Sequence, residues 1–262
     1  MVLSCSARYK GRMTAPRSRL ALSAAAAVAL SVIAGTASAA PSPSPGTLAP
    51  TKGPYAPNID PANFVATIDN PYMPFKPGTA FHFEGFRGTT PQTDDEVVTR
   101  RTIRLLGVRS TVVRDTVSEH GRAVERTDDF YAQDKDGNVW YMGEDSFELQ
   151  NGRFVKADDS WRSGVNGGKP GIIMPAHPRV GDDYRQEYYP PGKALDEARV
   201  LHVGSGRLAV PFGTFTGLLV TSERSPAEPQ TEHKYYARGV GEIAERVIKG
   251  EPEEFKLTRV TH

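Results

Sequence analysis

The sequence predicts a mainly β protein, built as a single antiparallel, strongly curved sheet that is half-barrel or sandwich-like and carries one or two short helices. Two observations lead to this fold class. Short runs of alternating polar and apolar residues, rich in β-branched and aromatic types, recur along the chain. Between them lie turns as short as "DKDGN" (134–138) and "RGVG" (238–241). Strands joined by such short turns must be antiparallel, because a parallel connection needs about a dozen or more residues.

Residues 1–39 are interpreted as a cleavable secretory signal peptide. An uncharged, alanine-rich apolar run follows two arginines and precedes the small-residue sequence "ASA", so cleavage is expected between Ala39 and Ala40. The start codon is either Met1 or Met13, and the second gives a leader of ordinary length. The segment predicts a secreted or cell-envelope protein that has no stable membrane span after processing.

Removal of residues 1–39 changes the formal charge from +1 to −4, because those residues include five basic and no acidic ones. The composition of such a mildly acidic protein does not indicate the basic surface that binding to nucleic acid or anionic lipid requires. The single cysteine, Cys5, also lies in the removed segment. The mature chain is therefore expected to fold without a disulfide and without a lipid anchor, held by its own core.

The mature chain divides into a linker and one domain. Residues 40–58 are crowded with proline and small polar residues, which predicts an extended, poorly ordered linker. Residues 59–262 carry the recurring turn signals and are interpreted as a single β-rich domain. Within it, one short helix is expected at 61–67, where Asp60 is the N-cap, and another at 192–198.

Nine segments show the composition and alternation typical of strands. In chain order they are residues 79–86, 96–106, 110–117, 138–144, 184–189, 198–203, 217–223, 242–249 and 254–260. Several have one apolar face, as Phe81 and Phe83 show, so one side of the sheet is expected to meet water. Residues 139–142 differ, because apolar side chains occupy both faces of that strand. A covering segment or a ligand is expected there.

The stretch "DKDGN" is interpreted as a hairpin turn and not as a calcium site. Asp134, Asp136 and Asn138 have the spacing of the first EF-hand ligands, but the loop has its glycine at the fourth position instead of the sixth. Asp-Gly between β-type runs is a strong hairpin signal. The loop 163–171 likewise departs from the phosphate-loop pattern and is expected to be a flexible surface loop.

No metal site and no cofactor are expected from the motifs. The histidines form no paired-ligand spacing of the kind that zinc sites use. A copper site that included Met174 and His177 is an alternative, because thioether and imidazole groups suit that metal. Scattered methionines are more often core residues, and we favour that interpretation.

A secreted hydrolase acting on cell-wall or glycan material is an alternative function. Its acid and base would come from the set Glu144, Asp145, Glu187 and His233. The sequence contains no Gly-x-Ser-x-Gly motif, and abundant acidic residues are usually solvent-exposed charge. We therefore expect binding instead of catalysis and assign no catalytic residue.

Aromatic residues in and beside the strands indicate a ligand site. Tyrosine and tryptophan pair an apolar body with a polar tip, so they can line an amphipathic pocket, although they serve equally well as core. The candidate ligand-binding residues are Trp140, Met142, Trp161, Tyr188 and Tyr235. We expect a non-enzymatic exported protein whose sheet adjoins an apolar cavity for a lipid or other amphipathic small molecule. A surface module that recruits another protein through an exposed edge strand is a third hypothesis.

Three segments carry a resemblance: "YAQDKDGNVWYMGED" (131–145), "GDDYRQEYY" (181–189) and "EHKYYARGVGEI" (232–243). They resemble a family of uncharacterised exported bacterial proteins with a Tyr-Ala-x-Gly-Val-Gly turn near the end. The resemblance spans most of residues 68–260 and implies no catalytic residue. More distantly, the antiparallel strands look like the half-barrel folds of LolA-type carriers of lipids and lipoproteins. That likeness implies a curved sheet with a binding face, but this chain lacks the lipid-attachment cysteine of lipoprotein relatives.

Overall fold

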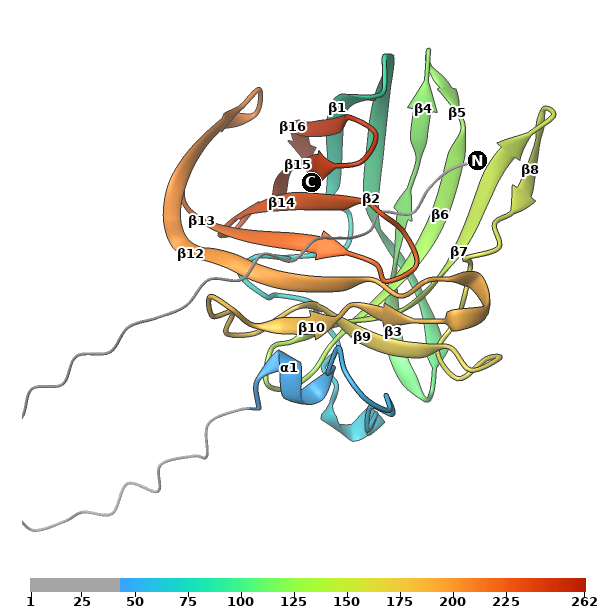
Figure 1. The fold of residues 1–262 in the computed structure, drawn as a ribbon, viewed down its shortest axis with the longest axis vertical. Coiled ribbons are helices and arrows are strands. Elements are labelled where there is room, and N and C mark those ends of the chain that lie inside the picture. Colours follow the sequence, from blue (N-terminus) through green and yellow to red (C-terminus); the bar gives the residue numbers. More distant parts are fainter. Residues whose placement is uncertain (1–42) are drawn as a thin grey trace, which may run out of the picture. The chain divides into compact units, whose positions relative to one another are not determined.

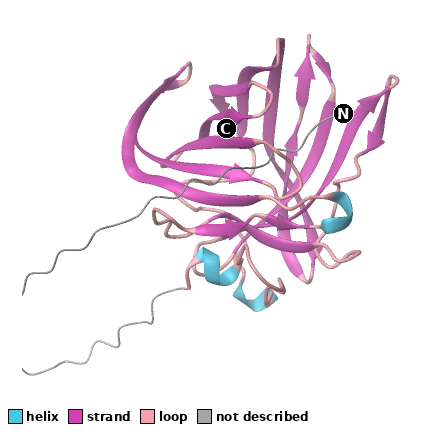
Figure 2. Ribbon diagram, in the orientation of Figure 1, coloured by secondary structure: helices cyan, strands magenta, loops and turns pink. Residues whose placement is uncertain are grey.

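The computed structural model describes residues 43–262. In this part of the chain, sixteen strands form one antiparallel sheet that curves nearly into a closed barrel with one seam (Figure 1 and Figure 2). The predicted fold class, a mainly β protein with a single curved antiparallel sheet, is confirmed. The signal-peptide prediction and its cleavage site at Ala39 and Ala40 lie outside the described residues.

The helical elements are short: α1 spans Pro45–Leu48, and the 3-10 turns η1 and η2 span Pro61–Asn63 and Pro190–Gly192. The strands are β1 (Ala80–Arg87), β2 (Thr90–Leu105), β3 (Val108–Asp115), β4 (Val117–Glu119), β5 (Arg122–Ala123), β6 (Glu125–Gln133), β7 (Val139–Gln150), β8 (Arg153–Lys156), β9 (Lys169–Met174), β10 (Asp183–Arg185), β11 (Glu187–Tyr188), β12 (Glu197–Val210), β13 (Gly213–Arg224), β14 (Thr231–Ala237), β15 (Gly241–Lys249) and β16 (Glu253–Thr261).

Most of the sheet follows one path of neighbouring strands. In spatial order these are β10, β12, β13, β14, β15, β16, β1, β2, β3, β6, β7, β9 and β11. Strands β4 and β5 extend from β2, and β8 pairs with β7. Within the path β1 lies beside β16, with Ala80 opposite Thr261. The sheet is therefore completed by pairing the first described strand with the last.

The seam of the sheet lies at Gln186. The two end strands of the path, β10 and β11, are consecutive in the chain and are separated by this one residue. Its backbone N–H donates a hydrogen bond of 2.7 Å to the carbonyl oxygen of Asp196. Gly171 packs so closely against it that a Cβ at position 171 would overlap the Gln186 carbonyl group. The chain itself thus bridges the two ends of the sheet, and this approach requires a glycine.

Residues N-terminal to β1 contribute to the apolar core, most of which comes from residues of the strands. All of Val139–Gly143, at the start of β7, is buried. The expected cover for this strand is supplied by the N-terminal segment: the ring of Phe64 lies 6.3 Å from that of Trp140 in an edge-on arrangement, and the backbone N–H of Val65 donates to the Gln133 carbonyl oxygen at 2.9 Å. The N-terminal segment therefore covers the face of this strand that carries Trp140.

Residues 43–58 differ from the extended linker expected of them. They contain α1, and Tyr55 is buried against the sheet. Arg185 of β10 donates hydrogen bonds to the carbonyl oxygens of Pro50 and Thr51, at 2.9 and 2.8 Å. Because a proline-rich chain cannot satisfy its own carbonyl groups in regular structure, donors from the sheet hold it in place.

The "DKDGN" hairpin is confirmed. It connects β6 to β7, and Gln133 pairs with Val139 across it. The carboxylate of Asp134 accepts hydrogen bonds from the backbone and side-chain nitrogens of Asn138, both at 2.9 Å, and from the indole nitrogen of Trp140 at 2.8 Å. The oxygens that resembled calcium ligands therefore fix the turn.

The helix predictions gave mixed results. Near residue 61 the helix is confined to η1, where Asp60 accepts a hydrogen bond of 2.9 Å from the backbone N–H of Ala62. The helix expected at 192–198 is wrong, because Lys193 has a left-handed backbone with φ of 62° and Glu197 already begins β12. The weak helical propensity of "GKALDEA" is outweighed by strand pairing.

Strands β5, β6, β8, β9 and β14 were not among the predicted strands, and residues 184–189 form two strands where one was expected. Strands β6 and β14 were missed because charged residues replace the apolar ones on one of their faces. These charged residues belong to the candidate site.

Candidate functional site

The inner face of the curved sheet contains two adjoining cavities. The arginine lobe has a volume of about 240 Å³ and includes Arg87 in its wall. The tyrosine lobe has a volume of about 260 Å³ and includes Tyr131 and Tyr141. The two lobes share the lining residues Glu96, Asp115, Glu144, Glu232 and Lys234. The two lobes therefore adjoin each other and are described together as one candidate site.

Carboxyl groups dominate the lining of both lobes. Among the described residues, fifteen acidic side chains line the site, against the two basic ones of Arg87 and Lys234. The acidic residues are Asp94, Glu96, Asp115, Glu125, Asp129, Glu144, Glu148, Asp159, Glu187, Asp196, Glu223, Glu232, Glu242, Glu245 and Glu253. Carboxylates gathered this closely cannot all be ionised unless cations or protons compensate them.

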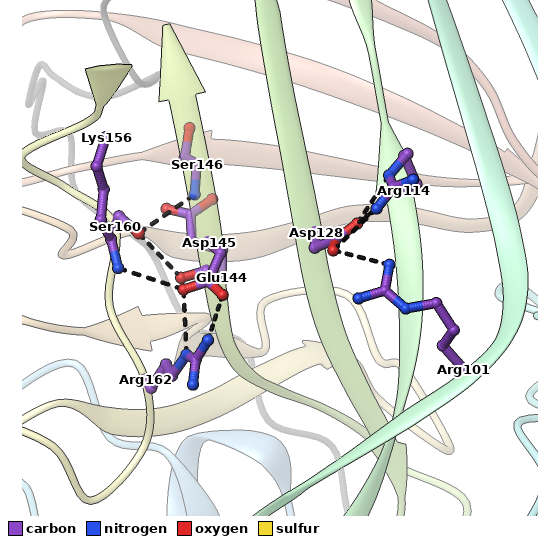
Figure 3. Close-up of polar contacts among 9 residues, drawn as sticks. All are labelled: Arg101, Arg114, Asp128, Glu144, Asp145, Ser146, Lys156, Ser160 and Arg162. Carbon is purple, nitrogen blue, oxygen red and sulfur yellow. Dashed lines mark hydrogen bonds and ion pairs between the residues drawn. The ribbon is translucent and has the colours of Figure 1, made fainter. Parts of the chain in front are cut away.

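Strand geometry sorts the acidic side chains between the two faces of the sheet. On β7, Glu144 lines both lobes, whereas the next residue, Asp145, forms ion pairs with Arg162 and, at 3.3 Å, with Lys156 (Figure 3). Successive side chains of a strand point to opposite faces. The inward-facing acids come from many strands, so the barrel curvature is what brings them together.

Lys234 of β14 is the basic residue at the junction of the two lobes. Its Nζ lies 3.3 Å from a carboxylate oxygen of Glu245, and 3.7, 3.8 and 3.9 Å from those of Glu232, Glu242 and Glu223. Burial lowers the pKa of this ammonium group, but the four carboxylates outweigh burial and raise it well above its usual value. Lys234 therefore stays charged and shows that the site holds an ammonium group.

In the arginine lobe, Arg87 of β1 is held by Glu253 of β16. Its Nε and Nη2 each donate a hydrogen bond of 2.8 Å to the Glu253 carboxylate. In this bidentate pair the positive charge of Arg87 is compensated by the carboxylate of Glu253. Burial raises the pKa of Glu125, on the same wall, to about 7, although the charge of Arg87 opposes the shift. One arginine does not neutralise the lobe.

In the tyrosine lobe, aromatic donors hold the carboxylates in position. The Tyr141 hydroxyl donates to Asp129 at 2.6 Å and lies 3.1 Å from Glu144. The indole N–H of Trp161 donates to Glu187 at 2.7 Å. The Trp161 ring stands edge-on to the Tyr141 ring, with centroids 5.7 Å apart. These donors orient the carboxyl groups but bring no positive charge to them.

The inward-facing carboxyl groups have raised pKa values. Burial raises the pKa of Glu96 to about 8, and those of Asp129 and Glu187 to about 7. Repulsion from Asp94 acts in the same direction on Glu96 and Asp129. Near neutral pH the site therefore retains protons, which an incoming cation would displace.

Gln186 is a neutral residue in the lining of the tyrosine lobe. Only 2% of the residue is exposed. Within residues 43–262, no group accepts a hydrogen bond from its Nε2. A buried amide without a partner costs free energy, so this nitrogen is a local source of instability in the wall of the lobe.

None of the five predicted ligand-binding residues is in the lining of either lobe. Trp161 is the nearest, since it holds Glu187. Trp140 and Met142 are buried in the core, and Tyr188 packs 5.6 Å from Tyr55. Tyr235 is half-buried on β14. The lining is acidic, whereas the sequence led us to expect an apolar cavity.

The four residues of the hydrolase hypothesis do not lie on one face of the sheet. Glu144 and Glu187 both line the tyrosine lobe. Asp145 forms its ion pairs with Arg162 and Lys156 and does not line either lobe. His233 lies between two inward-facing residues of β14, so it points to the other face. The structure does not bring the four together.

Sequence reasoning missed Lys234 and most of the acidic lining. A signal was present in the alternation of charged residues within strands, as at Asp94 and Glu96 in β2 and at Glu232 and Lys234 in β14. Charged residues at every second position of a strand share one face. Such a pattern in several strands of one sheet indicates a polar interior.

The described residues provide neither a metal cluster nor a membrane-spanning helix. In residues 43–262, no three His, Cys, Asp or Glu side chains are grouped in a way that would hold a metal ion. The carboxylates are spread around the cavity wall. The helices of this same region are too short, or not apolar enough, to cross a membrane.

No protein-family model matches the chain, and no curated protein matches it. Among solved structures, the chain is similar to a proposed exported protein with a YmcC-like fold from Bacteroides fragilis, with 12% identity over 73% of this chain and 99% of that one and a TM-score of 0.43. It is also similar to a proposed lipoprotein from Parabacteroides distasonis, with 14% identity over 72% of this chain and 98% of that one and a TM-score of 0.39. The resemblances drawn from the C-terminal turn and from LolA-type carriers stay predictions.

Proposed function

We propose that the protein is an exported, non-enzymatic binding protein whose acidic cavity takes up a ligand with several positive charges. The observation that carries the proposal is the charge of the lining, with fifteen acidic residues against two basic ones. A polycation relieves the repulsion among the carboxylates, and a cavity of one sign of charge concentrates such ligands. Export is part of the proposal and rests on the leader at residues 1–39.

Lys234 indicates how the ligand is held. Its ammonium group has carboxylate oxygens from four residues within 3.9 Å. The remaining carboxylates of the lining offer similar surroundings to ammonium or guanidinium groups of a ligand. Hydrogen bonds between charged partners are stronger than neutral ones, so several such contacts give both affinity and salt sensitivity.

The acidic lining changes the ligand class that the sequence had led us to expect. A lipid chain in this cavity would surround carboxylates with hydrocarbon and leave them without compensation, which is costly. An organic polycation removes that cost. The hypothesis of a ligand-binding exported protein is kept, and the lipid is replaced by an amine-bearing or guanidinium-bearing molecule.

Calorimetric titration of the purified secreted protein with spermine, a linear polyamine with four amines, tests the proposal. We expect one saturable site whose affinity falls steeply with added salt. The double variant Glu96→Gln, Glu232→Gln should weaken binding by about tenfold to a hundredfold, because it removes charge-assisted contacts. The matched control Asp145→Asn removes one outer carboxylate and should leave the affinity unchanged.

Two outcomes would contradict the proposal. One is the absence of saturable spermine binding together with an unchanged melting temperature. The other is tight binding of Ca²⁺ at a concentration where spermine does not compete. The second result would assign the cavity to a metal ion in place of an organic cation.

A further inference from the structure

The two ends of the sheet are incompletely paired beside the tyrosine lobe. β9 pairs with β11 only through its first two residues, so in the described part of the chain residues 172–174 have no strand partner on that side. β10, at the other end of the path, pairs only with β12. Ile173 and Gln186 both line the tyrosine lobe. The unpaired stretch of the seam therefore borders the cavity.

Residues 43–58, called the N-terminal strap below, lie against this stretch. The backbone N–H of Arg185 in β10 donates a hydrogen bond of 2.8 Å to the carbonyl oxygen of Ala49. An N–H that is bonded to the strap is not bonded to β12, so the strap occupies the free edge of β10. On the other side of the seam, the hydroxyl of Tyr55 donates to the carbonyl oxygen of Pro170 in β9. The strap thus joins β10 to β9 across the seam.

The closed seam contains two buried polar atoms without partners. Tyr184 Oη and Gln186 Nε2 form no hydrogen bond with any of residues 43–262. They belong to the two neighbours of Arg185, the residue that the strap holds. A buried polar group of this kind costs free energy, which hydration on opening would recover. Opening of the sheet is therefore less costly here than at its fully paired strands, and the hydrogen bonds of the strap oppose it.

We propose that the N-terminal strap is a latch on a side portal of the tyrosine lobe, through which the ligand enters and leaves when the strap undocks. The passage of a ligand rests on the proposed function, whereas the latch itself does not. None of residues 43–58 belongs to a strand. The strap is thus held by separate hydrogen bonds and not by a strand ladder, so it can undock while the paired strands stay folded.

Hydrogen exchange of the whole secreted protein tests the latch without a ligand. We expect the Arg185 amide and the strap to exchange faster than the amides of β1 and β16. The variant Tyr55→Phe should speed exchange at Arg185 about fivefold or more, because it leaves the buried Pro170 carbonyl without its donor. The control Tyr235→Phe changes a half-buried tyrosine on β14 and should leave that rate unchanged.

An unchanged rate at Arg185 in Tyr55→Phe would overturn the latch. If that variant fails to fold, Lys169→Met replaces it in the same measurement. This substitution removes the hydrogen bond from the lysine Nζ to the Tyr55 carbonyl oxygen and should speed exchange at Arg185 as well.

Stopped-flow binding of spermine tests the portal. In Tyr55→Phe, association and dissociation should both be about fivefold faster or more, with an unchanged affinity, because the substitution alters the route and not the carboxylates. Faster exchange with unchanged spermine rates would overturn the portal, since the ligand would then use another route. Absence of spermine binding to the natural protein would overturn the proposed function, and the exchange comparison would still decide the latch.

Discussion

Two pairs of acidic residues face each other across β6 and β7, and their surroundings are opposite. Asp128 pairs with Asp145 on the outer face, and Asp129 pairs with Glu144 on the inner face. All four come from the same short stretch of two strands. Differences between them therefore reflect the face of the sheet and not the sequence neighbourhood.

The outer pair is neutralised by basic side chains (Figure 3). Asp128 forms ion pairs of 3.0 Å with Arg101 and 2.8 Å with Arg114. Asp145 is held by Arg162 and Lys156. Burial tends to raise the pKa of Asp145, but its two basic partners outweigh burial and hold that pKa below its usual value. On the outer face, like charges in adjacent strands are thus compensated locally.

The inner pair has no such partners. In the described part of the chain, no ion pair joins Asp129 or Glu144 to a basic residue, and their shared partner is the neutral hydroxyl of Tyr141. Burial raises the pKa of both carboxyl groups. The comparison teaches that, within these two strands, basic partners compensate the carboxylates of the outer face, whereas the inner pair has only a neutral hydroxyl partner.

The largest expected effect is on the pH dependence of stability. Inner carboxyl groups with folded pKa values of about 6 to 8, such as Asp94, Asp129 and Glu96, have unfolded values near 4. The folded state then binds more protons than the unfolded state, so the free energy of unfolding falls as pH rises from about 5 to about 8.5. Denaturant unfolding across this range should show the decline, and saturating spermine should reduce it.

A flat stability profile over that range would contradict the inner–outer contrast. The contribution of the outer residue Asp145 to the pH dependence of stability has the opposite sign. Its lowered pKa contributes stability that is present above its unfolded pKa and is lost on acidification. The variant Asp145→Asn should therefore leave the slope between about pH 5 and 8.5 unchanged.

Removal of the central cation should have the next largest effect. The variant Lys234→Met leaves four carboxylates around an apolar side chain, and loss of one partner from a buried ion cluster costs about 3 kcal/mol. Chemical unfolding at pH 8 measures this loss. The outer variant Lys156→Met is the control and should cost less than about 1 kcal/mol. Equal losses in the two variants would refute the distinction.

Loss of the donor behind Glu187 should have a smaller effect. The variant Trp161→Phe removes the indole hydrogen bond of 2.7 Å while keeping an aromatic ring. We expect a cost of about 1.5–2 kcal/mol in unfolding free energy, within the range for a hydrogen bond to a charged group. The pKa of Glu187, followed by carboxyl NMR, should rise further above about 7. An unchanged or lowered pKa would show that the indole does not hold this carboxylate.

The smallest expected effect compares single neutralisations on the two faces. At pH 8, Asp129→Asn should stabilise the unliganded protein by about 1 kcal/mol, because it removes repulsion and keeps an acceptor for Tyr141. Asp128→Asn should destabilise it by up to about 1 kcal/mol through loss of its pairs with Arg101 and Arg114. Melting temperatures of the two variants should move in opposite directions, and a shift of the same sign would count against the comparison.

The features that were predicted from the sequence are those that depend on residues close together in the chain. The fold class and the hairpin at 134–138 follow from alternation and turn chemistry, and both are confirmed. The candidate site was not predictable in the same way, since Glu96 and Lys234 meet only after the sheet has curved. The helix expected at 192–198 does not form, because residues from Glu197 onward pair with other strands. Such pairing depends on residues far away in the chain, so a local sequence pattern does not predict it.

The pairing of β1 with β16 has a consequence for the time at which the protein folds. Ala80 cannot find Thr261 until the whole chain between them has been synthesised. Closing so long a loop costs conformational entropy before any contact repays it, and topologies with many distant contacts fold slowly. A nascent chain of this kind cannot complete its sheet before its last strand has been synthesised.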